Sequence, residues 1–256
     1  NITAKTLTAT ASASNKVYDG DNTATTTLTL SGLIGSETLN STNTSTFNNK
    51  NAGTNKPVTV NSITLQDGSG DADNYSISAG QTTTANITAK PLSISGITAS
   101  NKIYDGNTVA TIDTSLVDFG GLVSGDDVNI TASGNFSDKN VANNKTVTIT
   151  SSYAGTDLNN YVITDQSTTL ADITERPAGI TGITVFGLTL NNKIYDGTDI
   201  APLDTSNISY SGLVPGDDFS GTFTGVFSAG KDVGANKTVV ITSSYSGADV
   251  GNYSVT

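Results

Sequence analysis

Apolar residues alternate with threonine and serine along much of the chain, which is the pattern of half-buried β-strands. Leu7, Ala9 and Ala11 occupy every second position near the N-terminus, and Val58 and Val60 do so later. Threonine, valine, isoleucine and tyrosine favour strands, whereas the abundant asparagine, aspartate and glycine favour turns. The pattern therefore predicts an all-β chain.

One short sequence occurs three times and gives the chain its register. It reads KVYDG at residues 16–20, KIYDG at 102–106 and KIYDG again at 193–197, at intervals of about 90 residues. Each copy is followed by an acidic turn, a strand that ends in phenylalanine and an Asn-Tyr pair, in the same order. Self-similarity at a fixed period is the signature of a tandem array. We therefore expect three like modules, each of which contacts chiefly its neighbours.

The last residues of each copy set the boundaries. Residues 1–5 read NITAK, and the same five letters return at residues 86–90. We expect the first NITAK to be the closing strand of a preceding repeat, so that the array continues N-terminally. The prediction is then a closing strand at 1–5, a first repeat at 6–90, a second at 91–176 and a third at 177–256 that lacks its closing strands.

The size and pattern of the repeats predict the architecture. We expect tandem Ig-like β-sandwich modules in a linear rod, in which apolar and tyrosine side chains lie between two sheets and threonine and serine face water. A β-grasp-like module is the alternative. Pro91 and Pro177 stand at the seams without a Gly/Ser spacer, which predicts short, stiff connections.

The amino-acid composition excludes several kinds of partner and of catalytic chemistry. Lys and Arg number 12 against 23 Asp and Glu, a net charge of −11. Because an acidic surface repels phosphate backbones, we expect no nucleic-acid partner. The chain has no cysteine and no histidine, so it lacks disulfides and the commonest general base. The sequence also contains no apolar run long enough for a membrane span.

The repeated motif is the first candidate site. Asp-Gly is a strong turn signal, because glycine accepts a positive φ and aspartate caps its own turn. We expect each tyrosine to pack across a hairpin end with its hydroxyl bonded to backbone; the alternative is an exposed aromatic for glycan stacking. The structural motif residues are Tyr18, Asp19, Gly20, Tyr104, Asp105, Gly106, Tyr195, Asp196 and Gly197.

Clustered acids are the second candidate site. Asp67, Asp71 and Asp73 place three carboxylates within seven residues of the first repeat. Calcium is bound by several oxygens, often from closely spaced aspartates, so these residues are a candidate calcium site. The other repeats keep one of these acids, at Asp157 and Asp249, which favours the competing interpretation of solvated turn acids. We predict no other cofactor.

Recurring lysines and asparagines raise a third possibility. Some surface β-sandwiches join lysine to asparagine through a spontaneous amide, which requires a desolvated, deprotonated lysine beside an acid. Lysines at strand ends are usually solvated, and that is the competing interpretation. The candidates are Lys16, Lys102 and Lys193 with Asn74, Asn160 and Asn252.

The ordered set of motifs resembles the YDG-type tandem repeats of large bacterial surface proteins, including filamentous-haemagglutinin-like adhesins and extracellular fibres. The resemblance rests on three Lys-x-Tyr-Asp-Gly copies, each followed by the acidic turn and the Asn-Tyr unit, with an Ile-Thr-x-(Lys/Arg) closing strand after the first two. It covers essentially the whole chain. The resemblance implies extracellular β-modules that act as a stalk or fibre, and it does not identify a ligand for this chain.

The favoured function is structural. We expect a stalk or fibre segment of an extracellular bacterial adhesin or surface filament that gives reach and stiffness and self-associates by strand complementation. Its partners would be neighbouring repeats of the same protein. The alternative is a carbohydrate- or host-surface-binding module, although only 6% of residues are aromatic. We do not expect an enzyme, because catalysis needs one special site and the three repeats share the same residues.

Overall fold

The computed structural model describes residues 1–177 and 183–255. Within these ranges the regular structure is β-strand, apart from three single-turn 3₁₀ helices, so the all-β prediction is confirmed. Residues 178–182, near the start of the predicted third repeat, and residue 256 lie outside the described part. No helix in the described ranges is long and apolar enough to cross a membrane.

The chain separates into two compact units. The first consists of residues 1–96, 114–131 and 151–166, and the second of residues 97–113, 132–150 and 167–256. The first unit therefore contains the first repeat and one end of the second repeat. The second unit contains the rest of the second repeat and the third, and each unit is described by itself.

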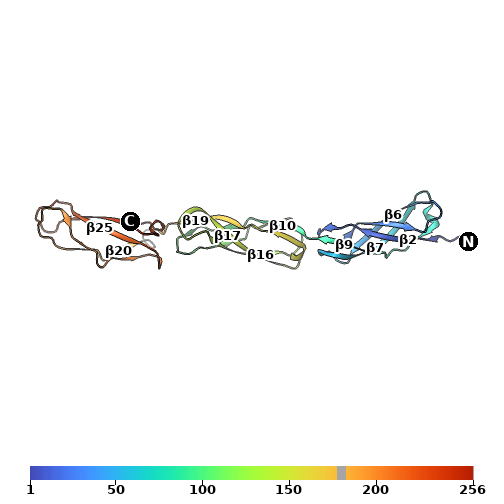
Figure 1. The fold of residues 1–256 in the computed structure, drawn as a ribbon, viewed down its shortest axis with the longest axis horizontal. Helices are drawn as coiled ribbons and strands as arrows, with labels where there is room; N and C mark the ends of the chain where they lie inside the picture. Colours follow the sequence, from blue (N-terminus) through green and yellow to red (C-terminus); the bar gives the residue numbers. More distant parts are fainter. Residues whose placement is uncertain (178–182, 256) are drawn as a thin grey trace. The chain divides into compact units, whose positions relative to one another are not determined.

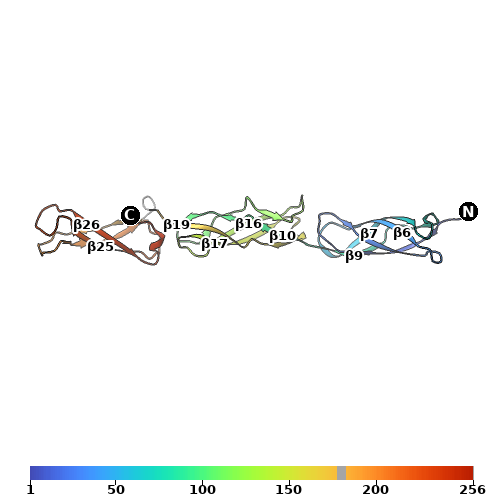
Figure 2. The ribbon, with the colours of Figure 1, turned by 90° about the horizontal axis from the view of Figure 1, so that it is seen from above.

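The first repeat is built on a five-stranded sheet with the strand order β3-β9-β7-β6-β4. Figures 1 and 2 show β6, β7 and β9 side by side along this repeat. A separate antiparallel pair, β2 with β5, and a short parallel pair, β1 with β8, complete it. Its elements are β1 (Lys5–Thr6), β2 (Thr8–Ala13), β3 (Lys16–Val17), β4 (Thr23–Ala24), β5 (Thr26–Ser31), β6 (Leu39–Phe47), β7 (Gly53–Asp67), η1 (Ala72–Asn74), β8 (Tyr75–Ser76) and β9 (Thr82–Thr88).

Strand β9 closes the first repeat because it lies between β3 and β7. It runs parallel to β3, with Lys16 opposite Ile87, and antiparallel to β7, with Lys56 opposite Ala85. Its inward side chains alternate with exposed threonines, as the sequence pattern predicts. Ile87 is 1% exposed, and Val58 on the neighbouring β7 is fully buried. The closing strand therefore supplies part of the hydrophobic core as well as hydrogen bonds.

The second repeat contributes strands to both units. In the first unit, β10 pairs in parallel with β18 and antiparallel with β15. In the second unit the strand order β12-β19-β17-β16-β13 repeats that of the first repeat, and β11 pairs with β14. The elements are β10 (Lys90–Ser95), β11 (Thr98–Ala99), β12 (Lys102–Ile103), β13 (Val109–Ala110), β14 (Ile112–Asp113), β15 (Asp118–Gly120), β16 (Asn129–Phe136), β17 (Ala142–Ala154), η2 (Leu158–Asn160), β18 (Tyr161–Thr164) and β19 (Thr168–Thr174).

The third repeat has a smaller main sheet. Among the described residues this sheet has three strands in the order β22-β25-β26, and the strands that would match β12 and β19 are missing from it. Two antiparallel pairs, β20 with β24 and β21 with β23, lie beside it. The elements are β20 (Thr184–Phe186), β21 (Thr189–Leu190), β22 (Ile200–Ala201), β23 (Leu203–Asp204), β24 (Ser209–Ser211), β25 (Ser220–Phe227), β26 (Val239–Ser246) and η3 (Val250–Asn252).

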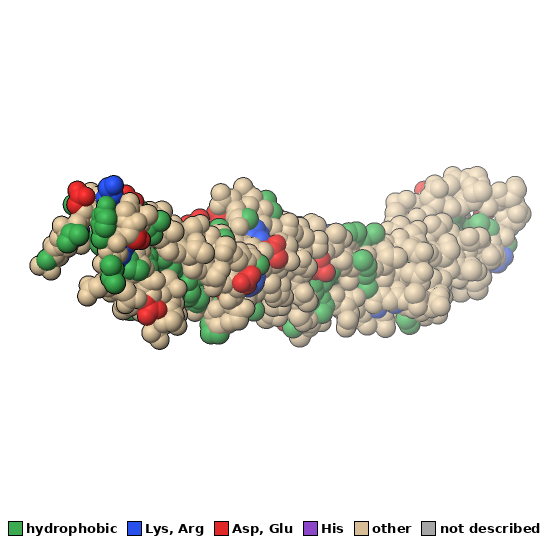
Figure 3. All heavy atoms as spheres, turned by 60° about the vertical axis from the view of Figure 1, so that its left-hand side comes forward, with side chains coloured by type: hydrophobic (Ala, Val, Ile, Leu, Met, Phe, Trp, Pro, Cys, Tyr) green, Lys and Arg blue, Asp and Glu red, His purple; other side chains and the backbone are tan. Residues whose placement is uncertain are grey.

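The surface is rich in uncharged polar groups, as the high content of threonine, serine and asparagine predicts. On the face drawn in Figure 3, uncharged polar side chains and backbone predominate, and acidic and basic groups are scattered among them. Threonine and serine supply most of the outward positions of the strands, as in β9. We observe no concentration of positive charge on that face.

Identical sequences occupy different environments at the two NITAK segments. Ile87 is buried in β9, whereas Ile2 is fully exposed and Asn1–Ala4 form no strand. Replacing Ile87 with alanine should therefore destabilise the first repeat by about 2–5 kcal/mol, the usual cost of deleting a buried aliphatic side chain. The same change at Ile2 should cost nothing measurable. Calorimetric unfolding of the two variants tests this, and equal losses would contradict the assigned role of β9.

Candidate functional site: the joint between consecutive repeats

Each Tyr-Asp-Gly motif forms a loop that is closed by its own lysine. In the second repeat, Lys102 Nζ lies 2.7 Å from the Asp105 carboxylate and donates to the backbone oxygen of Asn107 at 2.9 Å. Asp105 Oδ1 also accepts from the backbone amide of Asn107. The first and third copies have the same ion pair at 2.7 Å, between Lys16 and Asp19 and between Lys193 and Asp196. The loop is thus held internally before any neighbour is considered.

The motif does not join a hairpin, which corrects one expectation. The strands on either side of the first copy, β3 and β4, lie at opposite edges of the five-stranded sheet. Strand β3 pairs with β9 and β4 pairs with β6, so the loop crosses one end of the sheet. This placement presents the tyrosine at the end of the repeat.

In the first unit, the tyrosine of the first repeat meets an acid of the second. Tyr18 Oη donates to Asp126 Oδ2 at 2.7 Å, and Tyr161 Oη donates to the same oxygen at 2.6 Å. Lys50 Nζ lies 2.9 Å from Asp126 Oδ1. The tyrosine hydroxyl therefore bonds to a carboxylate of the following repeat, whereas the sequence led us to expect a backbone partner. The Asp126 side chain is only 2% exposed.

Further contacts surround this carboxylate. The rings of Tyr18 and Tyr161 meet edge to face, with centroids 5.5 Å apart. Lys50 also pairs with Asp157 at 3.2 Å and lies over the Tyr18 ring. The side-chain oxygen of Asn160, at the end of η2, accepts from the backbone amide of Ala52 at 2.9 Å. Ion pairs, an aromatic ring contact and a hydrogen bond to backbone are thus all found close to the Asp126 carboxylate.

The second unit contains the same arrangement between the second and third repeats. Tyr104 and Tyr253 donate to Asp217 Oδ2 at 2.7 and 2.6 Å, and their ring centroids are 5.5 Å apart. Lys139 pairs with Asp217 at 2.7 Å and with Asp249 at 2.8 Å. The backbone amide of Val141 donates to Asn252 Oδ1 at 2.9 Å. We call this set of contacts, in either unit, the joint.

The glycine of the motif makes room for the joint. Gly20 has a φ of +89°, and a Cβ there would lie 2.7 Å from Val123 Cγ1 of the second repeat. Gly106 has a φ of +81°, and a Cβ would lie 2.5 Å from Val214 Cγ1 of the third. These separations are shorter than any real contact of a Cβ atom, so a larger residue would push the valine away. In the first two copies of Tyr-Asp-Gly, the tyrosine thus bonds to the following repeat, the aspartate holds the loop, and the glycine leaves space for the valine.

Burial and hydrogen bonding act in opposite directions on the central acid. Burial alone raises the pKa of Asp126, but hydrogen bonds from Tyr161, Tyr18 and Lys50 outweigh it and keep the pKa below its usual value. Asp217 has a lowered pKa for the same reasons, with Lys139, Tyr253 and Tyr104 as donors. Burial, together with the bond to the acid, raises the pKa of Tyr161 and of Tyr253 to about 12. The carboxylate is therefore charged and the phenols are neutral at pH 7.

The third copy of the motif has the same loop in different surroundings, among the residues that the structure describes. A Cβ at Gly197 would meet nothing within 4 Å, although its φ of +84° matches the other copies. Tyr195 is 56% exposed, whereas Tyr18 and Tyr104 are each 1% exposed. The motif's backbone is thus formed locally, and the burial of its tyrosine depends on what surrounds it.

The candidate calcium residues are used locally. Asp67 Oδ1 accepts from the backbone amide of Ala72, and Asp71 caps η1 by accepting from the amide of Asp73. Across residues 1–177 and 183–255, no group of three or more acidic side chains is arranged to hold a metal ion. Calcium binding at Asp67, Asp71 and Asp73 stays a prediction that this geometry does not support.

The lysines and asparagines proposed for an amide crosslink have other partners. Lys16 is paired with Asp19 and Asp21. Asn160 and Asn252 accept from backbone amides in the joints. The residues therefore serve as a loop clamp and as backbone caps, and no crosslink is needed to explain their recurrence.

Sequence reasoning did not find the lysines of the joint. Lys50 and Lys139 each lie in a polar loop between two strands, and their position alone gives no indication of a partner. A signal was present nonetheless, because each follows its repeat's Phe47 or Phe136 by three residues. Aligning the loops in addition to the strands would have paired these lysines with the recurring acids.

These observations define the class of protein. The chain consists of tandem all-β repeats that are coupled through a tyrosine-bearing loop of one repeat and a buried acid of the next. A comparison with protein families matches the YDG domain three times, at residues 3–85, 88–169 and 180–256, so the chain belongs to the YDG domain family. No curated protein and no solved structure gives a significant match.

Alanine substitution of the motif glycines should separate backbone strain from contact across the joint. Gly197→Ala should cost about 1–2 kcal/mol, since only the positive φ is strained. Gly106→Ala has the same strain and should cost about 1–3 kcal/mol more, because its Cβ collides with Val214. Calorimetry, with hydrogen exchange measured around residues 210–217, checks the difference. Equal effects of the two substitutions would show that Val214 is not held against the loop.

The pKa shifts also predict how the joints respond to pH. The pKa of Asp126 and of Asp217 is lower in the folded protein than in the unfolded chain. Their ionised carboxylates therefore stabilise the folded state fully when the pH is above the unfolded pKa of about 3.9. This stabilisation is lost as the pH falls through the pKa of the folded protein. The raised pKa values of Tyr161 and Tyr253 give stabilisation that is complete below about pH 10 and is lost as the pH rises through about 12.

Unfolding temperatures measured across both ranges should therefore fall at each end. The variant Asp126→Asn/Asp217→Asn should be less stable at pH 7 and should show a weaker decline in acid. An unchanged acid profile in this variant would mean that other carboxylates dominate the acid response.

Proposed function

We propose that this chain is a structural segment of an extracellular bacterial adhesin or surface filament, in which the repeats act as a stalk or fibre that gives reach and stiffness. The observation that carries the proposal is the joint, since two successive pairs of repeats use the same tyrosines, acid, lysine and asparagine at nearly equal distances. A flexible tether between independent domains would not need such contacts, whereas a spacer that must keep its length would need them.

The proposal includes a finer architecture. Each repeat would be an Ig-like sandwich, and the repeats would follow one another end to end in a linear rod, with neighbouring repeats as the principal partners. The acidic, cysteine-free composition suits a bacterial surface. Antibodies raised against the chain should label intact, unpermeabilised cells of its source bacterium. Labelling only after lysis would contradict an extracellular location.

The aromatic residues weigh against a glycan-binding module. Of the residues that sequence analysis left open for stacking on sugars, Tyr18 and Tyr104 are buried in the joints. Their hydroxyls are bonded to carboxylates within the chain. Tyr195, the third such residue, is 56% exposed. One exposed tyrosine is not the recurring aromatic platform that would favour the alternative.

Solution scattering tests the stalk. We expect the full chain at neutral pH to give a long, narrow particle with a well-defined maximum dimension. In Asp126→Asn/Asp217→Asn both carboxylates lose their charge, so the joints should loosen and the distribution of dimensions should broaden towards shorter values. The control Asp73→Asn/Glu175→Gln removes two charges at exposed positions outside the joints and should leave the scattering unchanged. A compact wild-type particle, or one that is equally flexible in all three proteins, would refute the stalk.

A further inference from the structure

Tyrosine is the most readily oxidised side chain in this sequence. The chain contains no cysteine, methionine, tryptophan or histidine, and it has nine tyrosines. Cysteine and methionine are common targets of oxidants in proteins, and here an oxidant meets no sulfur, indole or imidazole. An electron removed from the chain is therefore expected to come from a tyrosine. The arrangement of the tyrosines then decides which product forms.

The joints place tyrosines in pairs. In the first unit, the hydroxyls of Tyr18 and Tyr161 bond to the same oxygen, Asp126 Oδ2, at 2.7 and 2.6 Å. Their ring centroids are 5.5 Å apart and the rings meet at 78°. The hydroxyls and the ring centres are thus both close, so the contact involves the part of each ring that carries the hydroxyl. In the second unit, Tyr104 and Tyr253 have the same separation and an angle of 77°.

The two tyrosines of a pair come from different repeats. Tyr18 belongs to the first repeat and Tyr161 to the second, whereas Tyr104 belongs to the second and Tyr253 to the third. Within residues 1–177 and 183–255, these are the only ring contacts between two tyrosines, since the other aromatic contacts involve a phenylalanine. A bond within either pair would therefore join consecutive repeats covalently.

The buried acid supplies the proton acceptor that oxidation of a phenol requires. The phenols are neutral at pH 7, since burial and the bond to the acid raise the pKa of Tyr161 and of Tyr253 to about 12. A neutral phenol becomes strongly acidic when it loses an electron, so it must also give up its proton. Asp126 and Asp217 already accept hydrogen bonds from these hydroxyls, which is the geometry for proton transfer. Each joint can thus hold a neutral tyrosyl radical.

We propose that each joint is a site of oxidative crosslinking, at which a dityrosine bond joins Tyr18 to Tyr161 and Tyr104 to Tyr253. The oxidant is a one-electron acceptor, and each bond consumes two equivalents. Each tyrosine gives one electron to the oxidant and one phenolic proton, by way of the aspartate, to water. The two phenoxyl radicals then couple between carbons beside their hydroxyls. The hydrogens on those carbons move to the oxygens and restore both phenols, so the bridged pair has two fewer hydrogen atoms.

The crosslink goes beyond the proposed function, because it depends on the geometry of the joint and not on whether the repeats form a stalk. Contact within the joint favours coupling between repeats of one chain over coupling between chains. Without the bridge, hydrogen bonds, ion pairs and packing hold the repeats together. A carbon–carbon bond would make the contact permanent without disulfide chemistry, for which the chain has no cysteine.

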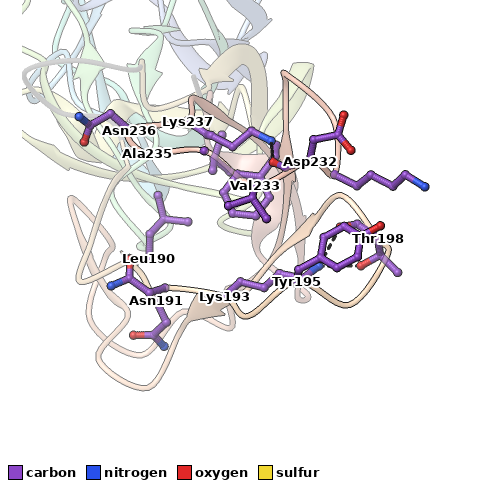
Figure 4. A pocket seen from close by; sticks show the side chains of 15 residues that line it. Leu190, Asn191, Lys193, Tyr195, Thr198, Asp232, Val233, Ala235, Asn236 and Lys237 are labelled. Atoms are coloured by element: carbon purple, nitrogen blue, oxygen red, sulfur yellow. Dashed lines mark hydrogen bonds between the residues drawn. The ribbon is translucent and has the colours of Figure 1, made fainter.

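Other tyrosines provide controls within the same chain. Tyr75 bonds to the carboxylate of Glu37, but among the described residues no second tyrosine ring contacts it. Tyr195 is 56% exposed, and Figure 4 shows it with Thr198 beside a pocket of about 530 Å³. Tyr195 is therefore open to an oxidant and has no paired phenol among the described residues, so coupling at this position requires a second chain.

Photo-oxidation of the full chain with tris(bipyridyl)ruthenium(II) and persulfate, which removes one electron at a time, tests the proposal. At low protein concentration we expect dityrosine fluorescence in a chain that stays monomeric on a denaturing gel. Its mass should fall by two hydrogen atoms for each bridge, and tandem mass spectrometry should find Tyr18 linked to Tyr161 and Tyr104 linked to Tyr253. The chain oxidised in urea should give at least about tenfold less of these links, because the pairs are no longer held together.

Phenylalanine variants identify the reacting tyrosines. Tyr18→Phe should abolish the first link and keep the second, whereas the matched control Tyr75→Phe should keep both. Tyr195→Phe should remove crosslinks between chains and keep both links within the chain. Absence of the two links while Tyr195 is oxidised would overturn the proposal. Equal yields in the folded and urea-unfolded chains, or undiminished dityrosine within the chain in Tyr18→Phe/Tyr104→Phe, would overturn it as well.

Discussion

A buried carboxylate that accepts two tyrosine hydroxyls is the interaction on which the repeats depend. Asp126 and Asp217 are almost fully enclosed, and a charge in such a place is costly unless it is hydrogen-bonded and paired. Each is satisfied by one tyrosine from its own repeat, one tyrosine from the preceding repeat and a lysine. Two of the three donors come from the preceding repeat, so the acid is fully compensated only when the two repeats are together.

The dependence extends through the closing strand. The tyrosine of one repeat is held by the last residue of its own closing strand, and that strand is also part of the core. The closing strand that completes the core of a repeat therefore also holds the tyrosine that contacts the next repeat. In the third repeat the motif glycine has the same backbone form, with a φ of +84°, while Tyr195 is 56% exposed.

Much of this could be predicted from the sequence, and the remainder has a physical explanation. Period-two alternation identified strands such as Thr82–Thr88, since each side chain's environment follows from the local pleat. The recurrence of Tyr-Asp-Gly identified the important loops. The partner of Tyr18 could not be predicted, because Asp126 is more than a hundred residues away and a tyrosine hydroxyl bonds equally well to backbone or carboxylate. The two meet because the loop at one end of the first repeat lies against the turn at residues 123–126 of the second.

The connection between the first two repeats is very short, and this has a mechanical consequence. Strand β9 ends at Thr88 and β10 begins at Lys90. Tension carried by the chain between the repeats is therefore applied directly along β9, which is hydrogen-bonded on both sides to β3 and β7. In the antiparallel ladder between β9 and β7 the hydrogen bonds lie perpendicular to the strands, so they would share a pull along β9. A force on this connection would therefore load the first repeat in shear along β9, against the strands on both of its sides.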